Sequence, residues 1–458
     1  MKLSRKQVRR HTSKVPELRF EDQRLTSYSG LVVFQLLFDK LNLEGKLTRC
    51  FRHLAGSESY GLGKIVLLLV VHLLLGFRHW REMRFYRHDP MVLRLVGLST
   101  LPDVSVLSRT LATADAKSVE KYRQLCRELI LVRLGELGLR RVTMDFDGSV
   151  LSTGRAAEGT AVGFNRKKKG QRSYYPLFCT IAQTGQVFDF LHRSGNCHDS
   201  RDAEQFLRQC VENLRKALPG LIIEVRMDGA FFSDSMVSLL QQLDIEFAIS
   251  VPFNRFVELK QRIEEQCLWH PLNTRTAYFE LQWKPKSWAR QFRFLVVRTR
   301  QRQRSKEPIQ LDLFVPYVEG YEFKVVVTNK TLGARKTVAF HNGRGAQEAI
   351  FGEIKSDCQL GYIPARTLHA NQIFLLAAIL AHNLNRELQM TVCSPQRPTL
   401  EKRPPLWSFK RMATTRNALI HTAGRLIRPQ GRLTLSLCAN PAIRKQLLHY
   451  VQQLQQAA

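Results

Sequence analysis

Arg141-Val-Thr-Met-Asp-Phe-Asp-Gly-Ser-Val150 alternates apolar and polar residues and then reaches a glycine. This pattern predicts a strand that ends close to Gly148. Side chains two positions apart share one face of a strand, so Asp145 and Asp147 are expected to point to the same side. Residues 28–135 read as helices, and we therefore expect the chain to change from helical to α/β structure at Arg141.

The residues that follow alternate between strand-like and helix-like patterns. Expected strands cover 174–180, 186–192, 221–226 and 246–251, and expected helices cover 200–218 and 234–243. The order β-β-β-α-β-α-β predicts an α/β core with an antiparallel start. Asp228 comes two residues after the apolar strand 221–226. The carboxyl ends of strands are where α/β folds place their sites, so Asp228 is a second candidate acid.

A third acid lies in a later helical pattern that resumes near His341 and continues to Glu387. At about 100° per residue, four side chains fall on one stripe roughly 60° wide: His341, Arg344, Glu348 and Lys355. Glu353 would lie about 120° from His341, away from that stripe. Bases around one acid suit a phosphodiester held beside a metal ion. A solvated face with an Arg–Glu pair is the alternative interpretation.

These acids together predict a metal site. Asp147, Asp228 and Glu348, with Asp145 as a further candidate, supply only oxygen ligands, which suit Mg²⁺ or Mn²⁺ rather than zinc. Two such ions about 3.5–4 Å apart stabilise both the attacking and the leaving oxygen of an in-line displacement.

The charge of the chain indicates a polyanionic partner. The 458 residues contain 70 Lys and Arg and 39 Asp and Glu, a net charge of +31. Residues 1–140 carry +12, residues 141–360 carry +8 and residues 361–458 carry +11. Neutralising phosphates with basic side chains releases counterions, so this excess predicts nucleic-acid binding. The candidate acids lie in the least basic of these three segments.

Nine cysteines without a zinc-like spacing fit unpaired thiols in a reducing cytoplasm. The longest apolar run, residues 65–76, is too short to cross a bilayer, so no membrane association is expected. The basic run 166–172, which includes Arg166, Lys167, Lys168 and Lys169, is expected to contact phosphate, with solubilising charge as the alternative. Trp269, Trp283 and Trp288 are expected in the core, with stacking on a flipped base as the alternative.

Several stretches resemble a known family. They are Asp145-Phe-Asp-Gly-Ser149, Gly154-Arg-Ala-Ala-Glu158, Gly163-Phe-Asn165, Ser173-Tyr-Tyr-Pro-Leu177, Arg193-Ser-Gly-Asn196, Arg226-Met-Asp-Gly-Ala-Phe231, Val327-Thr-Asn329 and the residues from His341 to Glu348. With them the chain resembles the DDE transposases of bacterial insertion sequences. The Tyr-x2-Arg-x3-Glu-x6-Lys signature of the insertion-sequence-four superfamily matches Arg344, Glu348 and Lys355, with His341 in place of the Tyr. More narrowly, the chain resembles the insertion-sequence family numbered thirteen-eighty, whose domain is called transposase DDE group 1.

The resemblance implies an RNase H-like catalytic core with a β-rich insertion, preceded by an α-helical DNA-binding domain. It implies cut-and-paste transposition in the bacterial cytoplasm and nucleoid, with two Mg²⁺ ions, double-stranded DNA and a homodimer that joins two inverted-repeat ends. In this family Arg344 and Lys355 would hold phosphates. Asp147 is favoured over Asp145 as the first acid, because Gly148 and Ser149 match the residues that usually follow it.

The expected organisation has six segments: a basic arm at 1–25, the helical DNA-binding domain at 26–138, the first part of the core at 139–254, the β-rich insertion at 255–330, the catalytic helix and the following helix at 331–393, and a basic C-terminal region at 394–458. Two other functions stay open. One is a catalytically inactive or repurposed sequence-specific DNA-binding protein, and the other is a stand-alone nuclease.

Overall fold

A computed structural model of the chain describes residues 17–18, 24–54, 60–163, 165, 168–198, 200–301, 320–397 and 405–456. Three parts of the sequence analysis concern residues outside these ranges. They are most of the basic arm, the residues Arg166 and Lys167, and a strand-like stretch at 311–318 within the expected β-rich insertion.

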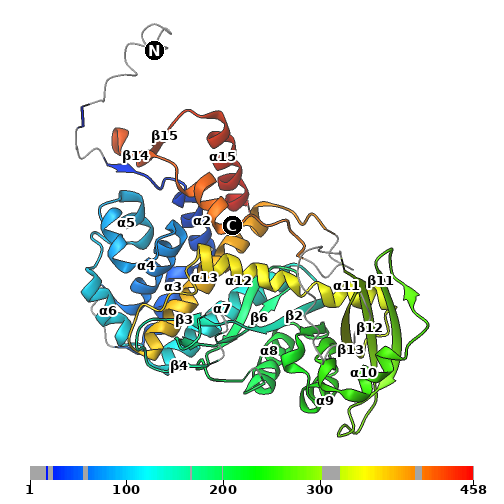
Figure 1. Cartoon of the computed structure of the whole chain (residues 1–458). Coiled ribbons are helices and arrows are strands. Elements are labelled where there is room, and N and C mark those ends of the chain that lie inside the picture. The colour runs from blue at the N-terminus through cyan, green and yellow to red at the C-terminus, as the bar shows by residue number, and fades with distance from the viewer. Residues whose placement is uncertain are drawn as a thin grey trace.

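A nine-stranded mixed sheet forms the centre of the molecule (Figure 1). The strands lie in the order β10-β11-β12-β13-β9-β8-β2-β6-β7. Their bounds are β2 Arg141–Gly148, β6 Leu177–Ile181, β7 Gln186–Leu191, β8 Ile222–Met227, β9 Glu246–Val251, β10 His270–Pro271, β11 Thr276–Trp283, β12 Phe292–Arg300 and β13 Tyr321–Thr328. Strands β2, β8 and β9 run parallel, and all other neighbours in this sheet run antiparallel. The expected α/β core with an antiparallel start is confirmed.

The alternation of residues along β2 explains why one face of the sheet is apolar and the other carries acids. Val142, Met144 and Phe146 are fully buried and belong to the core that includes α8 (Ala203–Ala217) and α9 (Asp234–Gln242). The ring of Phe146 lies edge-on to Phe206 of α8, with centroids 5.9 Å apart. Asp145 and Asp147 occupy the alternate positions, so their side chains point to the opposite face of the sheet.

The strands of the expected β-rich insertion continue the central sheet instead of building a separate one. β13 pairs antiparallel with β9, opposite Ala248 to Val251, so β10 to β13 extend the sheet beyond the parallel strands. Trp283 is 4% exposed and Trp288 is 6% exposed, and both pack on phenylalanine rings. These two residues are therefore core side chains. Trp269 is half-buried and has the guanidinium of Arg298 4.4 Å from its ring centroid.

Helices from both ends of the chain share one hydrophobic core. The helices before the sheet are α2 Leu31–Leu41, α3 Leu43–Phe51, α4 Leu62–Leu75, α5 Pro90–Val96, α6 Val104–Ala112 and α7 Ala116–Glu136. Within the region expected to be helical, Trp80–Phe85 form a 3₁₀ helix, η1. α13 (Leu368–Val392) packs against α4 and α7, and α15 (Pro441–Gln456) packs against α2. The boundary expected at residue 138 therefore does not separate two cores.

Two small sheets complete the fold. Strands β1 (Leu25–Thr26), β14 (Gly424–Ile427) and β15 (Thr434–Leu437) join the two ends of the described chain. Strands β3 (Leu151–Ser152), β4 (Ala161–Val162) and β5 (Arg172–Tyr174) follow β2. The remaining short helices are η2 Gly229–Phe231, η3 Phe253–Arg255, α10 Val257–Glu264, α14 Met412–Thr415, η4 Arg416–Ile420 and η5 Pro429–Gly431. Within the described residues, no helix has the length and apolar character needed to span a membrane.

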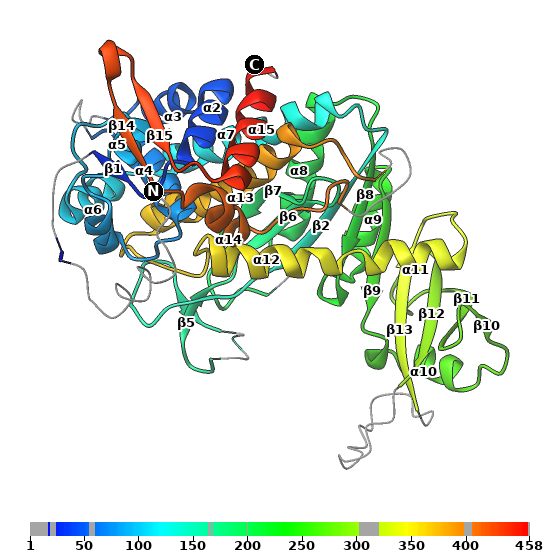
Figure 2. The same ribbon diagram turned by 90° about the horizontal axis from the view of Figure 1, so that it is seen from above.

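The helical pattern expected from His341 to Glu387 is divided into separate helices. α11 covers Ala334–Asn342 and α12 covers Gly345–Asp357, and Figure 2 shows them end to end beside the sheet. Gly343 and Arg344, which separate the two helices, keep right-handed helical backbone angles. A Cβ atom at Gly343 would come within 2.1 Å of Nη1 of Arg226, so the glycine leaves room for this buried guanidinium. His341 and Glu348 therefore lie on different helices.

Candidate active site

The register of the parallel strands brings two of the expected acids together. Phe146 of β2 lies opposite Met227 of β8. The next residues in each strand direction are Asp147 and Asp228, at the carboxyl edge of the sheet. Neighbouring strands lie about 4.8 Å apart, so both carboxyl groups belong to one small region of this edge. This is the location that α/β folds use for their sites.

Asp145 has a different role from Asp147. Its side chain is 1% exposed, and its two oxygens accept from Nε and Nη2 of Arg226 at 2.5 and 2.6 Å. Nη1 of Arg226 donates to the carbonyl of Phe340 at 2.9 Å, which connects β8 to α11. The side chain of Asp147 is 18% exposed. The buried ion pair occupies both oxygens of Asp145, and this geometry favours Asp147 as the reactive acid.

Arg344 connects Asp147 to Glu348. Its Nη1 lies 3.1 Å from Oδ2 of Asp147, and its Nη2 lies 3.8 Å from Oε1 of Glu348. The side chain of Glu348 is 69% exposed, at the start of α12. Two contacts dock this helix on the polar face of the sheet. Gln347 donates to the carbonyl of Asp145 at 2.8 Å, and Lys355 donates to the carbonyl of Val150 at 3.1 Å.

A cavity of about 930 Å³ opens beside Asp228. Its walls include Lys168 and Lys355, two of the expected phosphate-binding residues, whereas Lys169 is exposed and is not part of the lining. The cavity also contains residues that the sequence analysis missed: Ser149, Tyr175, His198 and Arg255. Arg255 was detectable in principle, because it follows β9, the third parallel strand, at the same carboxyl edge as the two aspartates. Among the charged side chains of the lining, Lys168, Arg255 and Lys355 therefore outnumber the one acid, Asp228.

His341 is not on an open face. Its ring is 1% exposed, and its Nε2 lies 3.1 Å from Oγ of Ser250 on β9. Burial, together with the nearby charges of Lys324 and Arg344, lowers the pKa of His341 to about 3. Along the expected stripe, His341 is buried, Arg344 is 18% exposed and Glu348 is 69% exposed. His341 therefore does not lie on a solvated face.

The carboxylates of the described residues do not surround a single point. Among the residues that the structure describes, no three His, Cys, Asp or Glu side chains gather closely enough to hold a metal ion. The guanidinium of Arg344 lies between Asp147 and Glu348. The donor set nevertheless consists only of carboxylates, which is the ligand type that Mg²⁺ and Mn²⁺ prefer. In donor chemistry the residues fit a hard divalent cation.

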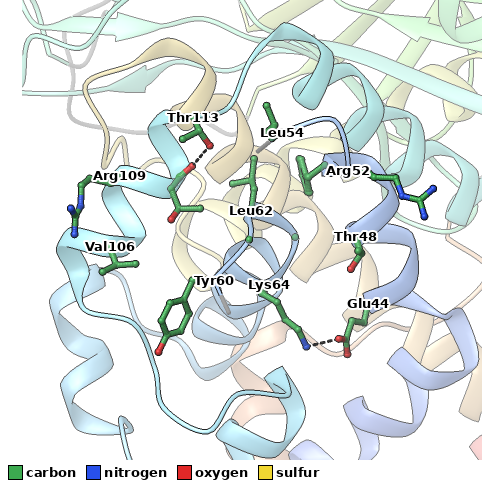
Figure 3. A pocket seen from close by; sticks show the side chains of 14 residues that line it. Glu44, Thr48, Arg52, Leu54, Tyr60, Leu62, Lys64, Val106, Arg109 and Thr113 are labelled. Atoms are coloured by element: carbon green, nitrogen blue, oxygen red, sulfur yellow. Dashed lines mark hydrogen bonds and ion pairs between the residues drawn. The ribbon is translucent and has the colours of Figure 1, made fainter. Parts of the chain in front are cut away.

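A second cavity, of about 680 Å³, lies among the N-terminal helices (Figure 3). It is lined by residues between Glu44 and Thr113, so it contains none of the candidate acids. Lys64 forms an ion pair with Glu44 on one side of it, and Figure 3 shows Arg52 and Arg109 at opposite margins. This cavity is separate from the carboxyl edge of the sheet.

The chain is similar in sequence to a known protein family and distantly similar to solved transposase structures. Similar solved structures are a piggyBac transposase synaptic complex with hairpin DNA (12% identity, 79% of this chain and 76% of that chain, TM-score 0.40) and a pre-cleavage Mos1 transpososome (13% identity, 43% and 60%, TM-score 0.17). No curated protein matches the sequence. The sequence profile described as transposase DDE domain group 1 matches residues 8–458. The chain belongs to this family of DDE transposases.

Proposed function

We propose that the chain is the transposase of an insertion sequence that moves by a cut-and-paste route. It would hydrolyse phosphodiester bonds at the terminal inverted repeats and join the freed 3′ ends to target DNA. The observation that carries this proposal is the placement of Asp147 and Asp228 at neighbouring ends of parallel strands, with Glu348 tied to Asp147 through Arg344. Membership of the DDE family supports the same reaction class.

The proposed catalytic residues are Asp147, Asp228 and Glu348, and these three carboxylates would hold Mg²⁺. When bound, the metal neutralises charge on the phosphate and activates the attacking oxygen. The chain's own side chains bind and orient the DNA. Lys168, Lys355 and Arg255 line the cavity beside Asp228, where phosphates of the DNA backbone would neutralise them.

The larger organisation is part of the same proposal. We assign the central sheet to an RNase H-like core and residues 26–138 to a DNA-binding region. Net charges of +12 and +11 at the two ends of the sequence, whose helices share one hydrophobic core, support DNA binding by the region that the two ends form together. Two copies would hold two inverted-repeat ends. Light scattering of the protein with end DNA tests this, and one copy per two ends would contradict it.

Substitution of the three acids tests the reaction. Asp147→Asn, Asp228→Asn and Glu348→Gln should each abolish Mg²⁺-dependent cleavage of inverted-repeat DNA and leave its binding affinity within about twofold. Asp244→Asn is the matched control. This residue is exposed and has a left-handed backbone (φ 48°) that asparagine also adopts, so cleavage should be unchanged. Full cleavage by the Glu348→Gln variant would refute the assignment of that residue.

The same assay separates the alternatives. A wild-type chain that binds the repeats but never cuts them would support a DNA-binding protein without catalysis. Cleavage without joined products, when a donor with a free 3′-OH is supplied, would support a stand-alone nuclease.

A further inference from the structure

The face of α12 opposite Glu348 is fastened to the C-terminal segment. At about 100° per residue, Glu353 and Asp357 lie about 140° and 180° around the helix from Glu348. Glu353 pairs with Arg386 of α13 at 2.5 Å and accepts from the backbone N–H of Met412 at 3.1 Å. Asp357 pairs with Arg411 at 2.9 Å. Residues 411–412 therefore contact α12 on the face opposite Glu348.

Arg416 adds a link from this helix to the N-terminal region. The residue is 9% exposed and begins η4. Its Nη2 donates to the carbonyl of Asp357 at 2.7 Å and to that of Leu73 at 3.1 Å, and its Nε donates to the carbonyl of Leu74 at 2.8 Å. These carbonyls belong to the last turns of α12 and α4. A cation is favoured there, because helix C-termini carry partial negative charge and free carbonyls.

The sequence of α4 makes room for this guanidinium. Gly76 ends the helix with φ 93°, a conformation that favours glycine. A Cβ atom at Gly76 would lie 2.6 Å from Nε and 2.7 Å from Cζ of Arg416. Two independent features, the glycine and the arginine, thus serve one contact between helices that are far apart in the sequence.

We propose that Arg416 is a positioning residue for the DNA-cleavage reaction, because it fixes the C-terminal end of α12 to the C-terminal end of α4 and so sets the position of Glu348 relative to Asp147. The inference rests on the proposed function. Through Arg416, the N-terminal helices, which are assigned to DNA binding, are also linked to α12, the helix that carries Glu348. A displacement of about 1 Å at a reacting group is enough to slow a reaction about 100-fold.

The test measures binding and cleavage separately. Arg416→Ala should lower the cleavage rate at saturating end DNA by about 10- to 100-fold, while the Kd for end DNA stays within about twofold. Millimolar guanidinium should restore part of the rate, since the small cation fits the space that the side chain leaves. Gly76→Ala should reproduce the defect by pushing the guanidinium away. The double variant should be no slower than the slower single variant, because both changes remove the same contact.

Gly220→Ala is the control for backbone strain. Gly220 has a similar φ of 80°, but a Cβ atom there would meet nothing within 4 Å, so its cleavage rate should match the wild type. A wild-type rate in Arg416→Ala would overturn the proposal. So would equal losses of rate and binding without guanidinium rescue, because these indicate only a loss of folded protein. If Arg416→Ala does not fold, the cleavage rate and the Kd for end DNA are measured on Arg416→Lys and Gly76→Ala instead, and the same outcomes support or overturn the proposal.

Hydrogen exchange distinguishes failure of this inference from failure of the proposed function. In the wild-type chain, amides of α12 from Ile350 to Asp357 should exchange slowly, and Arg416→Ala should accelerate this peptide at least tenfold with little change in β2. If the wild-type chain cuts no DNA, the proposed function fails, while a selective change in α12 still supports the coupling. Unchanged exchange in α12 overturns the coupling even if the wild-type chain is an active transposase.

Discussion

At the scale of single residues, two aspartates two positions apart lie in different environments. The sequence places Asp145 and Asp147 on one face of a strand and leaves open which is catalytic. It could not show that Arg226, on a neighbouring strand 81 residues later, binds both oxygens of Asp145. This pairing depends on strand register, which no local pattern encodes.

The two aspartates should therefore differ in a stability measurement. Asp145→Asn leaves Arg226 buried with an uncompensated charge, which costs about 3–5 kcal/mol. Asp147→Asn removes a partly exposed partner of Arg344 and should cost at most about 1 kcal/mol. Urea unfolding of both variants measures the difference. Equal losses of stability would show that the Asp145–Arg226 pair is not the stronger structural contact.

Arg344 should compete with cations for the acids. Its guanidinium lies beside Asp147 and Glu348, so Arg344→Gln removes a positive charge that opposes metal binding. We expect Mn²⁺, measured without DNA by electron paramagnetic resonance, to bind this variant several-fold more tightly. Asp147→Asn should bind Mn²⁺ more weakly in the same measurement. An unchanged affinity in Arg344→Gln would show that the arginine does not oppose the metal.

Buried histidines should make the fold sensitive to acid. Burial lowers the pKa of His72 to about 3 and that of His341 to about 3. Unfolded histidine titrates near 6.5, so the unfolded chain binds more protons, and stability present above about pH 6.5 is lost as the pH falls toward 3. Each ring should cost about 2 kcal/mol between pH 7 and pH 5. Urea unfolding at both values measures this loss, and His341→Gln should reduce it by about 2 kcal/mol. No reduction would exclude His341 as a contributor.

At the scale of elements, the sequence predicts most strands and helices but not their connections. Alternation predicts β2, and apolar runs predict β8 and β9, because local side-chain patterns decide these strands. The continuous helical pattern from His341 to Glu387 is wrong at residues 358–367, which separate α12 from α13 and include Gln359 with φ 59° and Pro364. A left-handed residue and a proline interrupt a helix without changing the apolar periodicity on which the prediction rests.

Gly343 should be a position that tolerates no side chain. Gly343→Ala places a Cβ atom 2.1 Å from Nη1 of Arg226 and should destabilise the fold by about 1–3 kcal/mol. Gly352 on α12 is the matched control, because a Cβ atom there meets nothing within 4 Å. Gly352→Ala should stabilise the helix by up to about 1 kcal/mol. Thermal unfolding of both variants decides, and equal effects would refute the steric requirement for glycine at position 343.

At the scale of the whole molecule, charge predicts a polyanionic partner without indicating where it binds. The cavity beside Asp228, which Lys168 and Arg255 line, is the location that we propose for it. Substituting either residue with alanine should reduce the slope of log K against log salt by about 0.9 for DNA binding. Lys286→Ala, at an exposed position outside the cavity, should change the slope less. An equal change of the slope in all three variants would show that these side chains act only through the net charge of the protein and not through contacts with DNA.

Strand β1 has a consequence for how the protein is made. Leu25 pairs with Arg425, a partner 400 positions later in the chain. At about 5–20 residues per second, a ribosome needs about 20–80 s to synthesise the residues between them. For most of that interval α2 has been made, but α15, which later packs against it, does not yet exist. The nascent chain thus exposes apolar surface for most of its synthesis, and the yield of folded protein should depend on chaperone supply during translation.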